Sequence, residues 1–176
     1  RDELAFVFLN RELASFVGGG SGASGDEVSY DARGIPHRAL DIRLTCRVEL
    51  YRLRARALVT NRSRERVSLD ASWVFAADYA DLLEAQDGKR QQQAAVEREV
   101  EADGVRLRYQ HERLRFETVL RASGPGQLDV AEDRCTWRLD LAPGEGASLE
   151  LIVDAHDPDL PLDDAARAER LRAQEA

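Results

Sequence analysis

The feature that most constrains the fold is an alternation of apolar and polar side chains with a period of two residues. The alternation is clearest over residues 40–48, where Leu40, Ile42, Leu44, Cys46 and Val48 are separated by Asp41, Arg43, Thr45 and Arg47. Successive side chains of a strand point to opposite faces. The stretch is therefore predicted to be a strand with one buried and one solvated face.

The apolar positions change from even to odd numbers near Glu49 and Leu50. Beyond this point the apolar residues are Tyr51, Leu53, Ala55, Ala57 and Val59. A single strand through both stretches would be much longer than the usual length of about 5–6 residues. We therefore expect a tight reversal or a bulge at this point.

The same alternation returns in shorter pieces along most of the chain. Gly, Pro, Asn and Asp turns separate further predicted strands at 5–9, 67–75, 105–109, 114–118, 128–130, 135–141 and 149–153. Residues 91–100 fit either a helical turn or the start of a strand. Short strands between such turns are typical of an antiparallel β-sandwich. The sequence thus predicts an all-β sandwich over residues 1–160 and a short C-terminal helix over 161–176 that serves as a linker.

Charge and composition narrow the classes of partner. Asp and Glu outnumber Lys and Arg by 33 to 25, which gives a net charge of −8. No excess of cations is present to neutralise phosphates, and this argues against a nucleic-acid partner. No apolar run approaches the ~20 residues that span a bilayer, so no membrane partner is predicted. The chain begins at Arg1 and contains no Met, as expected of a fragment of a longer protein.

The two cysteines bear on the cellular compartment of the protein. Cys46 and Cys135 stand at apolar strand positions. We interpret them as reduced core thiols of a cytoplasmic protein, and a disulfide between them stays open.

Residues 18–26, "GGGSGASGD", have the composition of a flexible segment. This segment is either a natural loop or an inserted linker.

Familiar catalytic and cofactor motifs are missing from the sequence. It contains no P-loop, no nucleophile elbow and no C-x-x-C pair. His37, His111 and His156 stand beside turns or strand ends, and we interpret them as solvated surface side chains. The triplet that begins at Asn61 is formally a glycosylation acceptor, which we attribute to chance. No catalytic residue, metal site or cofactor is predicted.

The acidic segment "SWVFAADYADLLEAQDG", residues 72–88, is the main candidate for a functional site. It places Asp78, Asp81 and Glu84 three residues apart. On a helical turn this spacing brings carboxylates onto one side, whereas on an extended chain it scatters them. A calcium loop needs acids at alternate positions, and a glycosidase pair needs a defined distance between carboxyl groups. The residues alone favour a solvated rim or helix start, ahead of an interface and far ahead of catalysis.

Residues 34–84 resemble the N-terminal β-sandwich domain of bacterial-type glycogen debranching enzymes, the amylo-α-1,6-glucosidase-like glycoside hydrolases. Ile35-Pro36 at the start of a long strand, "LVTNRS" at 58–63 and "FAADYADLLEA" at 75–85 carry the resemblance. Such domains show a D-F-A-D-L/I-F-E-V-R segment, which begins here at Asp78-Tyr79. "CTWRLDLAPGEGASLELIV" at 135–153 resembles their closing hairpin. The departures are Tyr79 and Leu83 in place of Phe, and Ala85-Gln86 in place of Val-Arg.

The resemblance implies a supersandwich-like domain without catalytic activity of its own. In such enzymes a C-terminal (α/α)6 barrel on the same polypeptide hydrolyses α-1,6 branches, and the sandwich packs on this barrel. Asp78, Tyr79, Asp81 and Glu84 would then lie at the domain interface or the rim of the cleft, where an α-glucan could also be contacted.

Two other functions stay open at this point. The chain could be a self-contained carbohydrate-binding module for α-glucans, since such modules stack sugars on exposed aromatic rings. Trp73 and Trp137 both stand at core positions of predicted strands, which argues against this function. An exposed Trp on a concave sheet face would favour it. The third alternative is a scaffolding sandwich that contacts no sugar.

Overall fold

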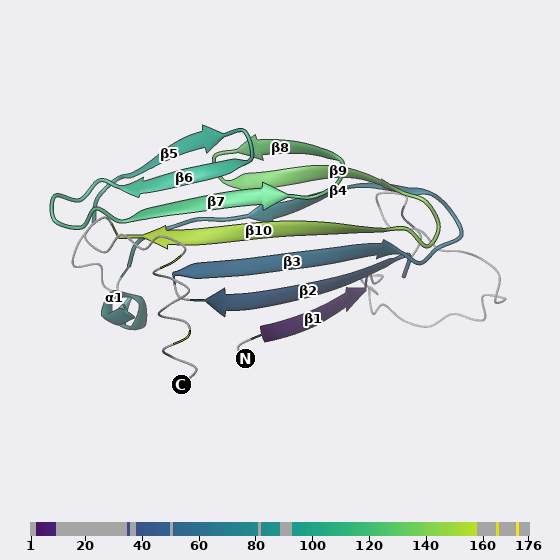
Figure 1. Ribbon diagram of the computed structural model, residues 1–176, viewed down its shortest axis with the longest axis horizontal. Coiled ribbons are helices and arrows are strands. Elements are labelled where there is room, and N and C mark those ends of the chain that lie inside the picture. The colour runs from purple at the N-terminus through teal and green to yellow at the C-terminus, as the bar shows by residue number, and fades with distance from the viewer. Residues whose placement is uncertain are drawn as a thin grey trace, which may run out of the picture.

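The computed structural model describes residues 3–9, 35, 38–49, 51–80, 82–88, 93–157, 165 and 172, without the side chains of residues 3–9, 82 and 87. The described residues form two antiparallel sheets and one short helix (Figure 1). The predicted all-β antiparallel sandwich is therefore confirmed. The predicted helical linker over 161–176 and the segment 18–26 lie outside the described residues, apart from residues 165 and 172, which are helical.

The larger sheet has seven strands and the smaller has three among the described residues. The order across the larger sheet is β1 (Glu3–Leu9), β2 (Leu40–Glu49), β3 (Arg52–Asn61), β10 (Gly146–His156), β7 (Glu117–Ser123), β6 (Gly104–Tyr109) and β5 (Val96–Glu101). The order across the smaller sheet is β4 (Val67–Val74), β9 (Arg134–Leu141) and β8 (Gln127–Ala131). The last strand of the chain, β10, therefore lies in the middle of the larger sheet, between β3 and β7.

The phase change near Glu49 marks a tight reversal, as one of the two sequence alternatives predicts. Glu49 pairs with Arg52, so β2 and β3 form a hairpin across residues 50 and 51. Tyr51 adopts a left-handed conformation, with φ of 58°. A sharp turn imposes this conformation even on a residue with a side chain.

The structure settles one strand alternative and corrects one strand boundary. Residues 96–101 form a strand rather than a helical turn. The strand predicted over 114–118 begins only at Glu117. Since β6 ends at Tyr109 and Arg108 pairs with Glu117, residues 110–116 must form the loop that reverses the chain.

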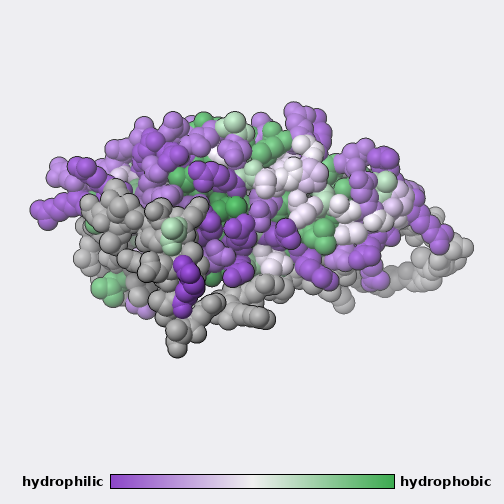
Figure 2. Space-filling view, in the orientation of Figure 1, coloured by the Kyte–Doolittle hydropathy of each residue, from purple (hydrophilic) through white to green (hydrophobic). Residues whose placement is uncertain are grey.

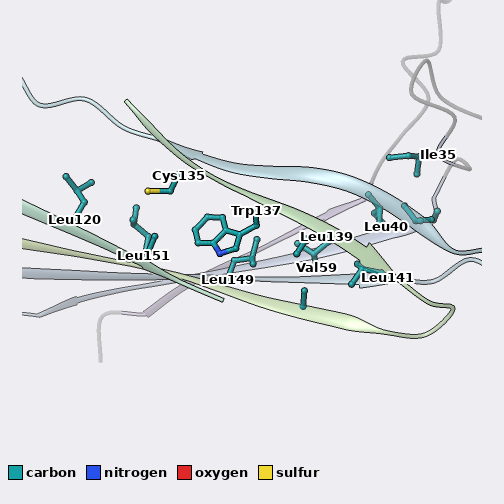
Figure 3. Packing of buried hydrophobic residues seen from close by; sticks show 14 of the residues in the cluster. Ile35, Leu40, Val59, Leu120, Cys135, Trp137, Leu139, Leu141, Leu149 and Leu151 are labelled. Atoms are coloured by element: carbon teal, nitrogen blue, oxygen red, sulfur yellow. The ribbon is translucent and has the colours of Figure 1, made fainter. Parts of the chain in front are cut away.

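The core lies between the two sheets and takes alternate residues from both (Figure 3). Trp137 on β9 is fully buried at its centre, and Trp73 on β4 is partly buried against it. Cys135 is also fully buried, whereas Cys46 on β2 is only partly buried, and both are free thiols. Burial raises the pKa of the Cys135 thiol. The opposite face of the larger sheet carries mostly hydrophilic side chains (Figure 2).

A buried amide joins the turns at one end of the sandwich. Asn61 has no exposed surface. Its side-chain amide donates to the backbone carbonyls of Glu65 at 2.7 Å and Leu141 at 2.9 Å. Its Oδ1 accepts from the backbone N–H of Ser63 at 2.9 Å and from the Ser63 hydroxyl at 2.8 Å. The sequence "LVTNRS" therefore ends β3 with an asparagine whose hydrogen bonds all serve the fold.

Candidate functional site

The acidic segment reaches the end of the larger sheet at which β6 and β10 finish. His156 near the end of the described chain pairs with Glu117 at the start of β7, and the N–H of Ala155 donates to the Tyr51 carbonyl at 2.8 Å. The end of β6, the start of β7 and the β2–β3 hairpin therefore share this end with the last residues of β10. In Figure 1, helix α1 (Leu82–Asp87) also lies on this side.

The segment that follows β4 is fixed by a local turn at Asp78. Asp78 is exposed, and its Oδ1 accepts from the backbone N–H of Ala80 at 3.1 Å. Tyr79, between them, has φ of 52°. A non-glycine residue with a positive φ is uncommon. This conformation costs about 1–3 kcal/mol in backbone strain, and it persists only where surrounding contacts hold it. Those contacts come from the Tyr79 side chain.

The Tyr79 side chain anchors the segment to the larger sheet. Its hydroxyl donates to the Leu107 carbonyl at 2.8 Å and lies 3.2 Å from the Thr118 hydroxyl oxygen. Burial raises the pKa of the Tyr79 phenol, partly offset by the hydrogen bond with Thr118. Tyr79 stands where the segment of the resembled family has Phe. Its additional hydroxyl connects β6 and β7.

Three rings stack in a column that starts at Tyr79. The ring centroids of Tyr79 and Tyr109 are 5.0 Å apart with planes 21° apart, and those of Tyr109 and His111 are 5.6 Å apart with planes 7° apart. Tyr109 is 3 % exposed, and its hydroxyl has no hydrogen-bond partner among the described residues. The Nδ1 of His111 accepts from the backbone N–H of Arg113 at 3.2 Å, which leaves the proton of the neutral ring on Nε2. We define these three rings as the aromatic column.

The structure places two of the three predicted carboxylates, Asp78 and Glu84, in different surroundings. Glu84 is 2 % exposed within the helix, whereas Asp78 is exposed in the extended segment before it. Asp81 lies outside the described residues. The helix ends at Gly88, whose φ is 64° and whose N–H donates to the Glu84 carbonyl at 3.0 Å, as at many helix C-termini. The interface or cleft-rim role of Asp78, Tyr79, Asp81 and Glu84 stays a prediction.

The hydrophilic face beside the aromatic column carries a network of ion pairs centred on Glu117. Both Arg106 and Arg108 bind its carboxylate, with Arg108 Nε at 3.0 Å, and they also bind Glu101 and Glu99 at 2.9 Å. The hydrogen bond with Glu117 raises the pKa of Arg108. For Arg106, burial works the other way, but the hydrogen bond with Glu101 and the charge of Glu117 raise its pKa overall. The ion pairs of these two arginines with Glu117 therefore connect the start of β7 to β6.

Two hollows flank the β6–β7 loop, which we define as residues 110–116. One has a volume of about 390 Å³ and the other about 620 Å³. Gln110, His111 and Glu112 line both. In the described part of the chain, no group of three His, Cys, Asp or Glu side chains has the arrangement of a metal site.

The sequence did not reveal this loop as part of the site. His111 was expected to be a solvated surface side chain, but it is partly buried and stacked on Tyr109. For His156 the expectation is confirmed, because that residue is exposed, and His37 lies outside the described residues. The only sign of this loop in the sequence is that Tyr109 and His111 stand two residues apart at the end of a predicted strand. It indicates that both rings point to one side, but not that Tyr79 meets them.

Replacing Tyr79 by Phe is expected to cost about 1 kcal/mol, since one hydrogen bond to a partly buried carbonyl is lost. Because the folded-state pKa of Tyr79 is raised, its contribution is fully present below the unfolded value of about 10 and is lost as the pH rises through the folded value. Urea unfolding of both proteins at pH 8 and near pH 11 measures this. The stability difference should shrink at the higher pH, and an unchanged difference would contradict the burial of the phenol.

A family model described as the N-terminal domain of some glycogen debranching enzymes matches residues 23–152. No curated protein matches the chain. In the described residues, no helix is long and apolar enough to cross a membrane.

Solved structures also match the chain, at low identity. A chain described as a kojibiose phosphorylase from the human microbiome matches with a TM-score of 0.49 and 8 % identity, over 77 % of this chain and 18 % of that one. A polysaccharide lyase matches with a TM-score of 0.43 and 16 % identity, over 85 % and 26 %. An aldose 1-epimerase-type protein from Escherichia coli K12 matches with a TM-score of 0.42 and 13 % identity, over 89 % and 66 %. This chain thus spans about a fifth to a quarter of the first two. The family match is the informative result, and it covers well over half of the sequence: the chain belongs to the family of N-terminal domains of glycogen debranching enzymes.

Proposed function

We propose that this chain is the non-catalytic N-terminal sandwich of a debranching-type α-1,6-glucosidase. In this proposal it packs on a C-terminal (α/α)6 barrel of the same polypeptide and helps to shape the cleft that receives branched α-glucan. The observation that carries the proposal is the family match over residues 23–152.

The arrangement of the site is compatible with a contact at the end of the sheet where β10 finishes. The described part of β10 ends at His156, beside the β2–β3 hairpin and the start of β7. Val48 and Tyr51, at that hairpin, are 63 % and 36 % exposed, and Leu83 on α1 is 63 % exposed. Exposed apolar side chains at one end of a domain are common at protein contacts. We propose that the barrel contacts the β2–β3 hairpin and α1 at this end.

The other candidate functions have weaker support. A carbohydrate-binding module built on tryptophan platforms is not favoured, since Trp137 is fully buried and Trp73 packs against the core. The two free thiols are compatible with the reducing cytoplasm, and we propose that location.

The experiment compares hydrolysis of a branched α-glucan by three proteins: the parent polypeptide, the parent without residues 1–176, and this chain alone. We expect hydrolysis by the parent, none by the chain alone, and a loss of at least about tenfold in kcat/KM when the chain is removed, which corresponds to 1.4 kcal/mol. A short linear maltooligosaccharide serves as the control substrate. Glucose release by the chain alone would overturn the non-catalytic role. Unchanged kcat/KM on removal would overturn the contribution to the cleft.

A further inference from the structure

The β6–β7 loop holds an imidazole ring in a fixed plane beside two open hollows. His111 stacks on Tyr109, which stacks on Tyr79, and the Tyr79 hydroxyl is bound to the Leu107 carbonyl. This aromatic column connects the loop to the body of the sheet. His111 lines both hollows, so the part of its ring that Tyr109 leaves uncovered faces them. A ring that is ordered before binding loses little conformational freedom when a ligand packs on it.

The polar groups around this ring are mixed in sign and free to bind. In the described structure Glu112 and Arg115 form neither an ion pair nor a side-chain hydrogen bond, and both line the hollow of about 390 Å³. The Nε2 of His111 also forms no hydrogen bond within the described residues, since the bond that the ring accepts is at Nδ1. A carboxylate accepts hydrogen bonds, a guanidinium donates them, and a neutral imidazole donates through Nε2.

This combination suits a neutral ligand with many hydroxyl groups. An anionic ligand would meet the Glu112 carboxylate, and a cationic one would meet Arg115. Hydroxyl groups both donate and accept, so they can satisfy both side chains at once. The C–H face of a pyranose ring is apolar and can pack against the exposed part of a planar ring. Both volumes fall in the range of about 300–1,000 Å³ found for small-molecule sites.

We propose that the β6–β7 loop is a glucan-contacting site, in which one glucosyl unit of an α-glucan packs on His111 while Glu112 and Arg115 bind its hydroxyl groups. The choice of an α-glucan rests on the proposed function, and the rest of the argument rests on the geometry of the loop. His111 is then a binding residue of an accessory site and has no part in bond cleavage.

The test is a titration of the 176-residue chain with maltoheptaose. Saturation-transfer NMR and calorimetry both measure the binding. We expect saturable binding with a Kd in the range of about 0.1–10 mM. His111→Ala and Glu112→Ala should each weaken binding by about tenfold or more, whereas His111→Phe, which keeps a planar ring, should stay within about threefold of the wild type. His156→Ala is the matched control, because this histidine is exposed at the same end of the sheet and lines neither hollow.

Three results would overturn the site. They are no saturable binding by the wild type at about 20 mM maltoheptaose, binding that His111→Ala leaves unchanged, and equal loss in His156→Ala. Circular dichroism and urea unfolding of each variant show that it is folded before its affinity is compared.

The outcome is separable from that of the proposed function. Hydrolysis that depends on residues 1–176 without maltoheptaose binding at His111 would reject this site and keep the proposed function. Binding at His111 without an effect of residues 1–176 on hydrolysis would keep the site and reject the contribution to the cleft.

Discussion

Replacing Asn61 by Asp is expected to destabilise the protein by about 3 kcal/mol or more, since one oxygen of a buried carboxylate would face two carbonyl oxygens. The amide of Asn61 faces the carbonyl oxygens of Glu65 and Leu141 at 2.7 and 2.9 Å. A carboxylate in its place has no hydrogen to donate and would face both oxygens as an anion in a site with no exposed surface. Asn61→Ala removes the charge problem but leaves both carbonyls and the Ser63 N–H without this partner, for a loss of about 2–3 kcal/mol.

Urea unfolding followed by far-UV circular dichroism measures both variants. Arg62→Ala, at the neighbouring position, is the control: it removes an exposed ion pair with Asp41 at 3.1 Å, and such pairs contribute about 0–1 kcal/mol. If Asn61→Asp unfolded at the urea concentration of the wild type, the hydrogen-bonded amide would not be what holds the β3–β4 turn. The same geometry closes the Asn61-Arg62-Ser63 triplet to glycosylation in the folded state, because both amide hydrogens are in use.

Replacing Trp137 by Ala is expected to cost about 3–5 kcal/mol, the usual effect of removing a large aromatic ring from a core. Trp137 is fully buried between the sheets, and a Cβ at Gly124 in the β7–β8 turn would lie 3.1 Å from its Nε1. The indole N–H has no hydrogen-bond partner in the part of the chain that the structure describes. Trp137→Phe therefore breaks no hydrogen bond and should cost only about 1–2 kcal/mol for the lost volume.

Trp73 remains in both variants, so fluorescence and circular dichroism can each follow the unfolding of the core. Val100→Ala, at a side chain that is 47 % exposed on the edge strand β5, is the control and should change stability by no more than about 0.5 kcal/mol. Equal losses in Trp137→Ala and Trp137→Phe would mean that the indole N–H, rather than the buried volume, determines the cost.

Much of the fold could be predicted from the sequence because strand alternation is a local signal. Leu40 to Val48 predicted β2, and the phase change near Glu49 predicted the reversal before β3. The assignment of strands to sheets could not be predicted in this way. The position of β10 between β3 and β7 depends on its pairing with β3, between residues 86 positions apart at Thr60 and Gly146 and 102 positions apart at Arg52 and Asp154. A single sequence carries no local mark of such pairing.

The candidate site was predictable only in part for the same reason. The segment that contains Tyr79 was identified from its acidic residues and its resemblance to a family, yet the contacts that define it are made by the Tyr79 ring. Tyr109 and His111 lie 30 and 32 positions further along the chain, beyond α1, β5 and the rest of β6. Three-residue spacing of Asp78, Asp81 and Glu84 predicted one-sided carboxylates only for a helix. Asp78 does not lie on the helix, because α1 begins after it, and Asp81 lies outside the described residues.

The central place of β10 also governs when this molecule can fold during its synthesis. A ribosome releases β3 early and β10 last among the described strands, and β3 pairs with no other strand on the side that β10 will occupy. Pairing over such a separation is slow, since a long loop must close before its contacts form. Until residue 156 has left the exit tunnel, the nascent larger sheet consists of two halves with open edges, and open edges favour aggregation. The facing edges of β3 and β7 therefore stay open until β10 has been synthesised, and a stop codon placed before residue 146 would release two half-sheets rather than a shorter domain.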